Sequence, residues 1–323
     1  MRTVHCKLAT VKPARIHGHA MPEGPEIRRA ADQIERALLG QELTAVWFKF
    51  PALKRFESAL AKSQVRAIET RGKALLTHFA NDLTIYSHNQ LYGIWRVCGE
   101  PENAVDVSTE SSFSKRDLRL ALSTAGATAR LYSASDISVH PTNELAQHPF
   151  LSRVGPDVLD PGLSAEQLFE RMRSRRFARK ALSTLLLDQK FLAGMGNYLR
   201  SEVLFAARIG PDLRPIDLSD ADARALSVAL LAVPRLSYQS DGVTNLRALA
   251  ADAKAALDSA LPGSARRIAK IARGNDDYEA HRFAVFDRDG LPCYDCNTRI
   301  ERIERAGRRL YFCPSCQSSK RQH

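Results

Sequence analysis

The sequence predicts an α+β protein of several domains: an N-terminal β-sandwich with a flanking helix, a helical domain, and a small C-terminal finger. Three observations predict this organisation. Seven short strand-like runs, separated by Gly, Asn, Asp and Ser, lie between residues 43 and 132. Helical periodicity replaces them after Pro161. Four of the six cysteines lie at residue 293 or later.

The N-terminal region combines one helix with many strands. From Glu26 to Leu38 apolar residues recur at helical spacing, and Gly40 supplies a stop. The short runs that follow are closely spaced, which favours a sandwich or a barrel. They are Leu43 to Phe50, Val65 to Thr70, Ala74 to Phe79, Leu83 to Ser87, Gly93 to Cys98, Leu118 to Leu122 and Ala129 to Tyr132.

The helical region and the remaining segments set the expected domain boundaries. Helices are expected at Ser164 to Arg173, Ala178 to Leu187, Asn197 to Ala207 and Ser219 to Leu231. An Ala-rich stretch with a Pro262-Gly263 break follows. We therefore divide the chain into an extension (1–20), a sandwich domain (21–150), a helical domain (151–239), an insertion (240–282) and a finger (283–323).

Composition narrows the class of protein. The 47 Lys and Arg residues exceed the 36 Asp and Glu residues and give a net charge of +11, which is compatible with a polyanionic partner. The hydrophobic fraction of 44% is typical of a globular chain, and no apolar run is long enough to span a bilayer. Because the first twenty residues lack the apolar core of a secretory signal, we expect a cytoplasmic protein.

The C-terminal cysteines form two C-x-x-C pairs, Cys293 with Cys296 and Cys313 with Cys316. This spacing matches the four-thiolate zinc ribbon. With all four positions filled by sulfur, one Zn²⁺ ion would have a structural role. The alternative, two redox or disulfide pairs, belongs to secreted domains and fits poorly here.

The residues between the cysteine pairs alternate in a way that predicts a hairpin. Its turn falls near Ala306-Gly307, which places Arg305, Arg308 and Arg309 at or near the tip. Arginines on a rigid hairpin suit phosphate recognition. The alternative is an ordinary solvated turn.

An internal start is the other distinctive feature. The segment Met21-Pro-Glu-Gly-Pro-Glu26 would leave Pro22 as a free secondary amine if the chain began at Met21 and lost its methionine. An α-amino group titrates near pH 8, so roughly a tenth of it is neutral at neutral pH. Pro22 is therefore a candidate nucleophile.

Three features together resemble the Fpg/Nei family of DNA glycosylases. They are the start at Met21, the segment Gly194-Met-Gly-Asn-Tyr198 and the zinc ribbon. The segments Val46 to Phe50, Thr70 to His78, Tyr86 to Gly93 and Val154 to Leu159 resemble the bacterial endonuclease VIII branch of that family. The resemblance implies that the helical region is a helix-two-turns-helix DNA-binding domain.

The resemblance also implies a function. It predicts a bifunctional glycosylase and abasic-site lyase of base excision repair that acts on double-stranded DNA. A monomer is the default expectation, since the sequence does not indicate an oligomeric state. Oxidised pyrimidines would be removed and the strand cut by β,δ-elimination. Two alternatives remain: a formamidopyrimidine-type enzyme for oxidised purines, and a non-catalytic binder of damaged DNA if the terminus stays blocked.

By the same resemblance, four residues take catalytic roles. Pro22 attacks the sugar C1′, Glu23 transfers a proton, and Glu26 supports the sugar or the amine. Lys73 contacts a phosphate and assists elimination. The alternatives are that both glutamates are ordinary helix N-terminal acids and that Lys73 is a solvated lysine at a strand end.

Five further residues are expected to contact DNA. Gln90, Leu91 and Tyr92 would fill the space left by an extruded nucleotide. Asn197 and Arg308 would clamp a phosphate. Otherwise, Leu91 and Tyr92 are strand-end core residues and Asn197 caps a helix.

Two segments depart from the family pattern. Residues 1–20 precede the proline, and a misassigned start is the leading explanation, ahead of proteolytic processing or targeting; the 323-residue form should be inactive as a lyase. The insertion is either a solvated loop or a segment that alters lesion preference and adds DNA contacts through Arg266, Arg267, Lys270 and Arg273.

Overall fold

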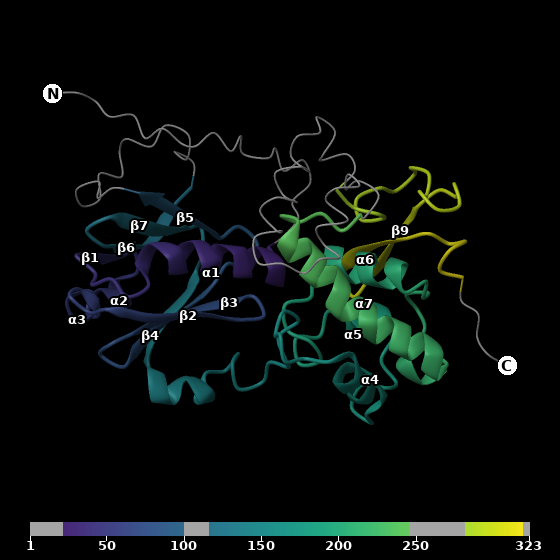
Figure 1. Ribbon diagram of the computed structural model, residues 1–323, viewed down its shortest axis with the longest axis horizontal. Coiled ribbons are helices and arrows are strands. Elements are labelled where there is room, and N and C mark those ends of the chain that lie inside the picture. The colour runs from purple at the N-terminus through teal and green to yellow at the C-terminus, as the bar shows by residue number, and fades with distance from the viewer. Residues whose placement is uncertain (1–21, 100–115, 246–281, 319–323) are drawn as a thin grey trace.

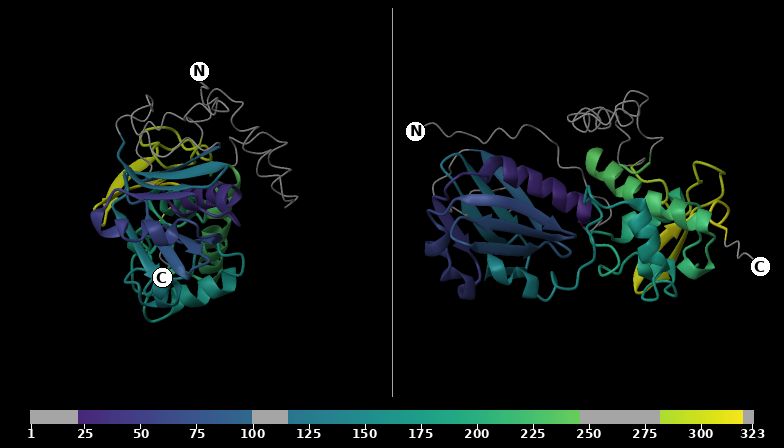
Figure 2. Two further views of the ribbon diagram at one scale, coloured as in Figure 1. Left: turned by 90° about the vertical axis from the view of Figure 1, so that its left-hand side faces the viewer. Right: turned by 60° about the horizontal axis from the view of Figure 1, so that its bottom comes forward.

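The computed structural model describes residues 22–99, 116–245 and 282–318. These residues form two lobes side by side, with a C-terminal hairpin packed on the second lobe (Figures 1 and 2). The extension and residues 246–281 of the insertion, including its four basic residues, lie outside the described residues.

The first lobe is a sandwich of two four-stranded antiparallel sheets. One has the order β1 (Ala45–Phe48), β6 (Leu118–Ser123), β7 (Ala127–Tyr132), β5 (Ile94–Gly99). The other has the order β2 (Val65–Arg71), β3 (Ala74–Phe79), β4 (Leu83–His88), β8 (Asp136–Pro141). The short helices α2 (Pro51–Lys54) and α3 (Glu57–Leu60) lie between β1 and β2 in the chain. Two separate sheets decide the question between sandwich and barrel in favour of the sandwich.

Helix α1 (Gly24–Leu38) contacts strands from both sheets (Figure 1). Its buried residues Ile27, Ala31 and Ile34, the ones whose spacing predicted it, belong to the sandwich core. Beyond the helix Gly40 takes a φ of 73°, a conformation that glycine adopts at little cost. The other end of α1 faces the second lobe, where the helix contacts α7.

The second lobe is helical. After the 3₁₀ turn η1 (Thr142–Gln147) come α4 (Ala165–Arg173), α5 (Leu182–Leu185), α6 (Asn197–Ala206), η2 (Pro215–Asp217) and α7 (Asp220–Gln239). Ser164 caps α4 by accepting a hydrogen bond from the Gln167 amide at 3.2 Å. Helix α6 packs against α7 and lies almost entirely within the core.

Three expectations differ from the structure. The helix expected over Ala178 to Leu187 is reduced to α5, because the amides of Leu182 and Ser183 bond to carbonyls of residues 213 and 211. Helix α7 continues eight residues past Leu231 and accommodates Pro234. Strand β8 was not expected; it lies at a sheet edge and ends in a proline, which edge strands tolerate.

The finger contains the predicted hairpin, β9 (Glu301–Arg305) and β10 (Arg308–Phe312). Ala306 and Gly307 form its two-residue turn with φ values of 53° and 67°, and positive φ at both positions is typical of a type I′ turn. Strand β10 packs on α6. Among the described residues, no helix is long and apolar enough to cross a membrane.

Candidate active site and nucleic-acid interface

Glu23 joins the two lobes. Its side chain is 1% exposed and points at the N-terminus of α6, where the amides of Tyr198 and Leu199 donate to its carboxylate at 2.9 and 3.3 Å. A Cβ at Gly196 would lie 2.3 Å from the Glu23 carboxyl carbon, so only glycine fits there. The glycine-containing turn therefore makes room for this carboxyl group.

The surroundings of Glu23 control its protonation. Burial raises the pKa of Glu23 to about 7, the Lys73 ammonium opposes that rise, and the Glu26 carboxylate adds to it. A carboxyl group with such a pKa exists in both protonation states near neutral pH. It can therefore donate or accept a proton during a reaction.

Lys73 sits in the two-residue turn between β2 and β3. The other turn residue, Gly72, has a φ of 62° and donates its amide to the Asp157 carboxylate at 2.6 Å. Burial lowers the pKa of Lys73, Glu23 raises it, and Arg308 of the finger lowers it further. These electrostatic interactions place Glu23, Lys73 and Arg308 around one site, although they come from three parts of the chain.

Glu26 lies behind this group as part of a polar network. Its carboxylate accepts hydrogen bonds from the Glu23 amide at 3.0 Å, from the Arg29 guanidinium at 2.7 Å and from the Tyr198 hydroxyl at 3.1 Å. Arg282 lies 3.8 Å away. Glu26 is thus a helix N-terminal acid and also a neighbour of the buried carboxyl group.

Sequence reasoning missed Arg29, Tyr198 and Arg282. Arg29 donates to the carbonyl of Ser237 at 2.6 Å, which links α1 to the end of α7. The Tyr198 hydroxyl bonds Ser237 at 2.8 Å. For Tyr198 the only indication of a role in the site was its position next to Asn197 in the sequence. Nothing in the sequence indicated such a role for Arg29 or Arg282.

Pro22 is half-buried and immediately precedes Glu23. The next amide, that of Gly24, donates to the Gly194 carbonyl at 2.8 Å. A Cβ on Gly24 would lie 3.1 Å from the Gly194 Cα, so the two backbones are in close contact. This contact fixes the segment that carries Pro22 against the turn before α6.

Asn197 is the first residue of α6, and a buried arginine connects it to the finger. The Arg200 guanidinium donates to the Ser183 carbonyl at 2.7 Å, the Arg309 carbonyl at 2.8 Å and the Asn197 side-chain oxygen at 3.4 Å. Burial lowers the pKa of Arg200 to about 10. The charge of Arg308, which precedes Arg309, also acts on the Arg200 guanidinium, so Asn197 and Arg308 both lie close to Arg200.

The arginines of the hairpin have different environments. Arg305 forms two hydrogen bonds to the Asp212 carboxylate at 2.7 and 2.8 Å, which attaches the hairpin to the helical lobe. Arg308 and Arg309 are exposed. Directly after the turn of the hairpin, Arg308 and Arg309 therefore present positive charge to solvent.

Gln90, Leu91 and Tyr92 form the turn between β4 and β5. Leu91 and Tyr92 are 51% and 57% exposed, so they are not core residues as one interpretation held. The loop is tightly held: the Gln90 amide donates to the His88 ring at 3.0 Å, and the Ser135 hydroxyl donates to the Gln90 side-chain oxygen at 2.7 Å. A rigid loop with two large exposed apolar side chains can enter a base stack.

The four cysteines of the finger converge. The sulfurs of Cys293, Cys296, Cys313 and Cys316 all lie within 4.8 Å of one another. The Cys293–Cys316 and Cys296–Cys313 sulfur distances are 3.9 and 3.4 Å. Sulfurs about 2.3 Å from a tetrahedral zinc ion would be about 3.8 Å apart, so the cluster fits a metal site.

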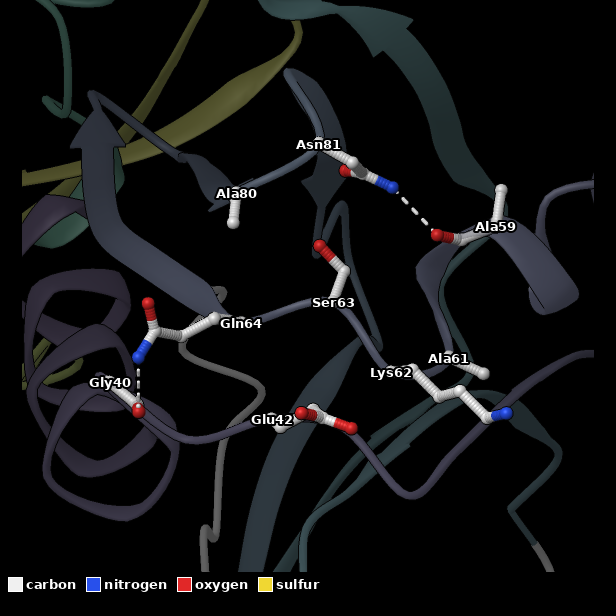
Figure 3. A pocket seen from close by; sticks show the side chains of 9 residues that line it. All are labelled: Gly40, Glu42, Ala59, Ala61, Lys62, Ser63, Gln64, Ala80 and Asn81. Carbon is white, nitrogen blue, oxygen red and sulfur yellow. Dashed lines mark hydrogen bonds between the residues drawn. The ribbon is translucent and has the colours of Figure 1, made fainter.

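The pocket in Figure 3 lies away from all of these residues. It is formed by the end of α1 and by the turns after α3 and β3, with Gly40, Glu42, Lys62, Ser63 and Asn81 among its lining residues. The Gln64 and Asn81 amides bond backbone carbonyls at its edge. No candidate site residue lines it, so it is not part of the site.

Comparisons with known proteins agree with this architecture. Residues 21–132 match the model of the formamidopyrimidine-DNA glycosylase N-terminal domain, and residues 154–246 match that of the formamidopyrimidine-DNA glycosylase H2TH domain. Complexes of Lactococcus lactis Fpg with abasic-site DNA and with oxidised-pyrimidine DNA superpose with a TM-score of 0.69 over 92% of this chain and all of Fpg. At 19% and 18% identity they show the shared fold.

Bacterial relatives are more similar in sequence. Endonuclease 8 of Escherichia coli O9:H4 is 47% identical over 297 residues, which cover 92% of this chain and all of the relative. Endonuclease 8 of Shigella sonnei is 46% identical over 301 residues with the same coverage. The chain therefore belongs to the Fpg/Nei family of DNA glycosylases and abasic-site lyases, the enzymes of base excision repair.

Proposed function

We propose that this protein removes oxidised pyrimidines from double-stranded DNA and cuts the abasic strand by β,δ-elimination, with Pro22 as the nucleophile. The observation that carries the proposal is the electrostatic interaction of Lys73 with both Glu23 and Arg308, at the residue that directly follows Pro22 in the chain. A nucleophile, a proton-transfer group and two cations for phosphate are the groups that this reaction needs.

Each step can be assigned to a residue. Protonated Glu23 donates its proton to O4′ as the Pro22 nitrogen bonds C1′ and the C1′–O4′ bond breaks. The base then leaves with the electron pair of the glycosidic bond and takes up the proton that the amine loses, which leaves an iminium ion between Pro22 and the opened sugar. Loss of a C2′ proton then expels the 3′ phosphate, and a second elimination expels the 5′ phosphate, with Lys73 balancing the negative charge.

The chemistry requires Pro22 to be the first residue. We therefore propose that the active protein begins at Met21 and loses that methionine. The family match that starts at residue 21 supports this proposal. We propose 21–150, 151–239 and 283–323 as the sandwich, helix-two-turns-helix and finger domains, with 240–282 as an insertion. The family matches over residues 21–132 and 154–246 support the first two domains.

The preference for pyrimidines rests on the likeness to endonuclease VIII, including the Gln90-Leu91-Tyr92 turn. Competition between duplexes carrying oxidised thymine and oxidised guanine tests it. Faster excision of oxidised thymine is expected. Preferential excision of the guanine lesion would favour the formamidopyrimidine-type alternative.

We assign Asn197 and Arg308 to a phosphate of the damaged nucleotide, which the Arg200 link to the finger supports. We also infer that the protein acts as a monomer in the bacterial cytoplasm, where its DNA substrate lies.

The cysteine cluster would hold one Zn²⁺ ion through Cys293, Cys296, Cys313 and Cys316. Thiolate ligands at all four positions give the ion a structural role: it stabilises the finger. Chelation should release one zinc per chain, unfold the finger and lower DNA affinity by about 100-fold, since binding energy at such a site is folding energy. Metal analysis and anisotropy measure this.

Cys98 provides the control for that experiment, because it lies in β5 outside the cluster. Cys98→Ser should keep the zinc and the affinity, whereas Cys313→Ser should lose both. A metal-free protein with unchanged finger structure would contradict the assignment.

The exposed pair Leu91 and Tyr92 should matter most where a base must leave the stack. Extruding a nucleotide costs a few kcal/mol, so Leu91→Ala with Tyr92→Ala should slow base excision from duplexes by roughly 10- to 100-fold. Cutting of a single-stranded abasic site should change little. Leu39→Ala is a matched control, since Leu39 is 44% exposed at the end of α1; equal losses on both substrates would argue against the wedge.

A further inference from the structure

A strongly basic part of the helical lobe plays no role in the reaction described above. Residues 171–180 contain six Arg and Lys side chains in ten positions. Arg173 turns toward η2 and the start of α7, where it donates to the Pro215 and Leu218 carbonyls and to the Asp220 carboxylate. The others, with one lysine that follows α5, form what we call the basic ridge: Arg171, Arg175, Arg176, Arg179, Lys180 and Lys190.

The ridge is organised around one buried aromatic ring. Arg171, Arg176 and Lys180 lie 5.1, 5.1 and 5.5 Å from the centroid of Phe177. Arg171 also donates to the Lys190 carbonyl at 2.6 Å, which joins the two ends of the ridge. Three cations gathered on one ring are held in place before any partner arrives.

The ridge carries more positive charge than its own lobe neutralises. Across residues 22–99, 116–245 and 282–318, the one ion pair made by a ridge side chain joins Lys180 to Asp188 at 2.7 Å. Arg175, Arg176, Arg179 and Lys190 are exposed. The pKa of Arg171 is lowered, first by burial and then by the neighbouring charge of Arg176. Exposed arginines crowded in this way suit a polyanion, and guanidinium groups bind phosphate well.

A groove connects the ridge to the candidate wedge. The groove has a volume of about 660 Å³ and is lined by His88 and Gln90 of the sandwich and by Arg153 of the connecting segment. Its other wall includes Asp188 and Lys190. The same groove therefore borders the loop that enters the base stack and the basic ridge.

We propose that the basic ridge binds the phosphate backbone of the duplex on one side of the lesion, beyond the wedge. The proposal rests on the proposed function for the position of the lesion but not for the binding of DNA itself. It adds a second contact surface that lengthens the DNA footprint without reading sequence.

The test measures salt dependence on duplexes with an uncleavable abasic analogue near one end, so that a long arm extends to one side only. The full chain with its zinc is compared with the triple variant Arg175→Ala, Arg176→Ala, Arg179→Ala. Each lost phosphate contact lowers the slope of log affinity against log salt by about 0.9, so the slope should fall by about 2.7 for one arm direction. The loss of affinity between 50 and 200 mM salt should then be about 40-fold smaller than for the unchanged protein.

The reversed duplex, with its long arm on the other side, should give equal slopes for both proteins. Unchanged slopes for both arms, or equal losses for both, would overturn the proposal. An undamaged long duplex should show part of the slope difference, because the ridge would bind its backbone without a lesion. The ridge measurement is therefore independent of the lesion chemistry. Failure to trap an abasic site would contradict the proposed function and would leave the ridge measurement unaffected.

Two further variants guard against unfolding. Arg176 packs on Phe177. The double variant Arg175→Ala with Arg179→Ala spares that contact and should show about two thirds of the slope decrease of the triple variant. Replacing the same three arginines by lysine should keep the slope. Arg224→Ala is the matched control, because Arg224 is exposed on the same lobe but is already ion-paired with Glu166.

Discussion

Protein that begins at Met21 should form a covalent adduct with abasic DNA under borohydride, whereas protein that begins at Met1 should form almost none. A proline inside the chain has its nitrogen in a tertiary amide, which cannot attack C1′. Pro22 without preceding residues is a secondary amine with an ordinary pKa near 8. Because covalent catalysis depends on that amine, we expect trapping to differ by about 1,000-fold or more between the two forms.

The control is Pro22→Gly in the shorter protein. A terminal glycine retains a primary amine, so weak trapping at residue 22 should remain, and peptide mapping should find the adduct there. Equal trapping by the uncleaved long form would instead identify another amine. Lys73 would be the first candidate, since its pKa is lowered and it lies beside Glu23.

Local patterns predicted most of the secondary structure. Strands β2 to β7 lie within two residues of the predicted runs, because each combines β-branched or apolar residues with turn residues at its ends. The hairpin turn at Ala306-Gly307 also followed from sequence. The helix predicted over residues 178–187 was too long. The amides of Leu182 and Ser183 donate to carbonyls elsewhere in the fold and not to the carbonyls that a longer helix would offer them.

The sequence suggested candidate site residues one by one but could not show how they assemble. Resemblance indicated Glu23, yet its burial depends on the amides of Tyr198 and Leu199, which lie more than 170 residues away in the chain. The same holds for the link from Arg200 to the hairpin backbone. Periodicity cannot reveal such contacts, because they join elements whose relative position only the fold determines.

The resemblance predicted the exposure of Leu91 and Tyr92, but the residue pattern alone did not. Both residues flank strands and would suit a core equally well. The structure exposes them because His88 and Ser135 hold Gln90 at a φ of 53°, which turns the chain out of the sheet. A positive φ at a glutamine is not readable from composition.

Glu23→Gln should lower base excision by about 100- to 10,000-fold, the usual contribution of a positioned acid or base. The amide matches the carboxyl group in size but cannot give a proton to O4′. The pH profile separates this cause from lost packing. Protonated Glu23 is depleted above its pKa of about 7, while neutral Pro22 is depleted below about 8, so the parent rate should pass through a maximum between these values. In the variant the alkaline limb should disappear, and the residual rate should rise with pH until Pro22 is neutral.

Stability should move in the opposite direction from activity in the same variant. The folded state raises the pKa of Glu23 above its usual 4.5, so the folded protein binds the proton more tightly than the unfolded chain does. The contribution of Glu23 to the free energy of unfolding is therefore fully present below pH 4.5 and is lost as the pH rises toward 7. Glutamine has no carboxyl proton to lose, so the Glu23→Gln variant does not lose stability in this way. At pH 8 the melting temperature of the variant should equal or exceed that of the parent. Lower activity together with a clearly lower melting temperature would mean that Glu23 matters for packing, and the proton-transfer role would have to be given up.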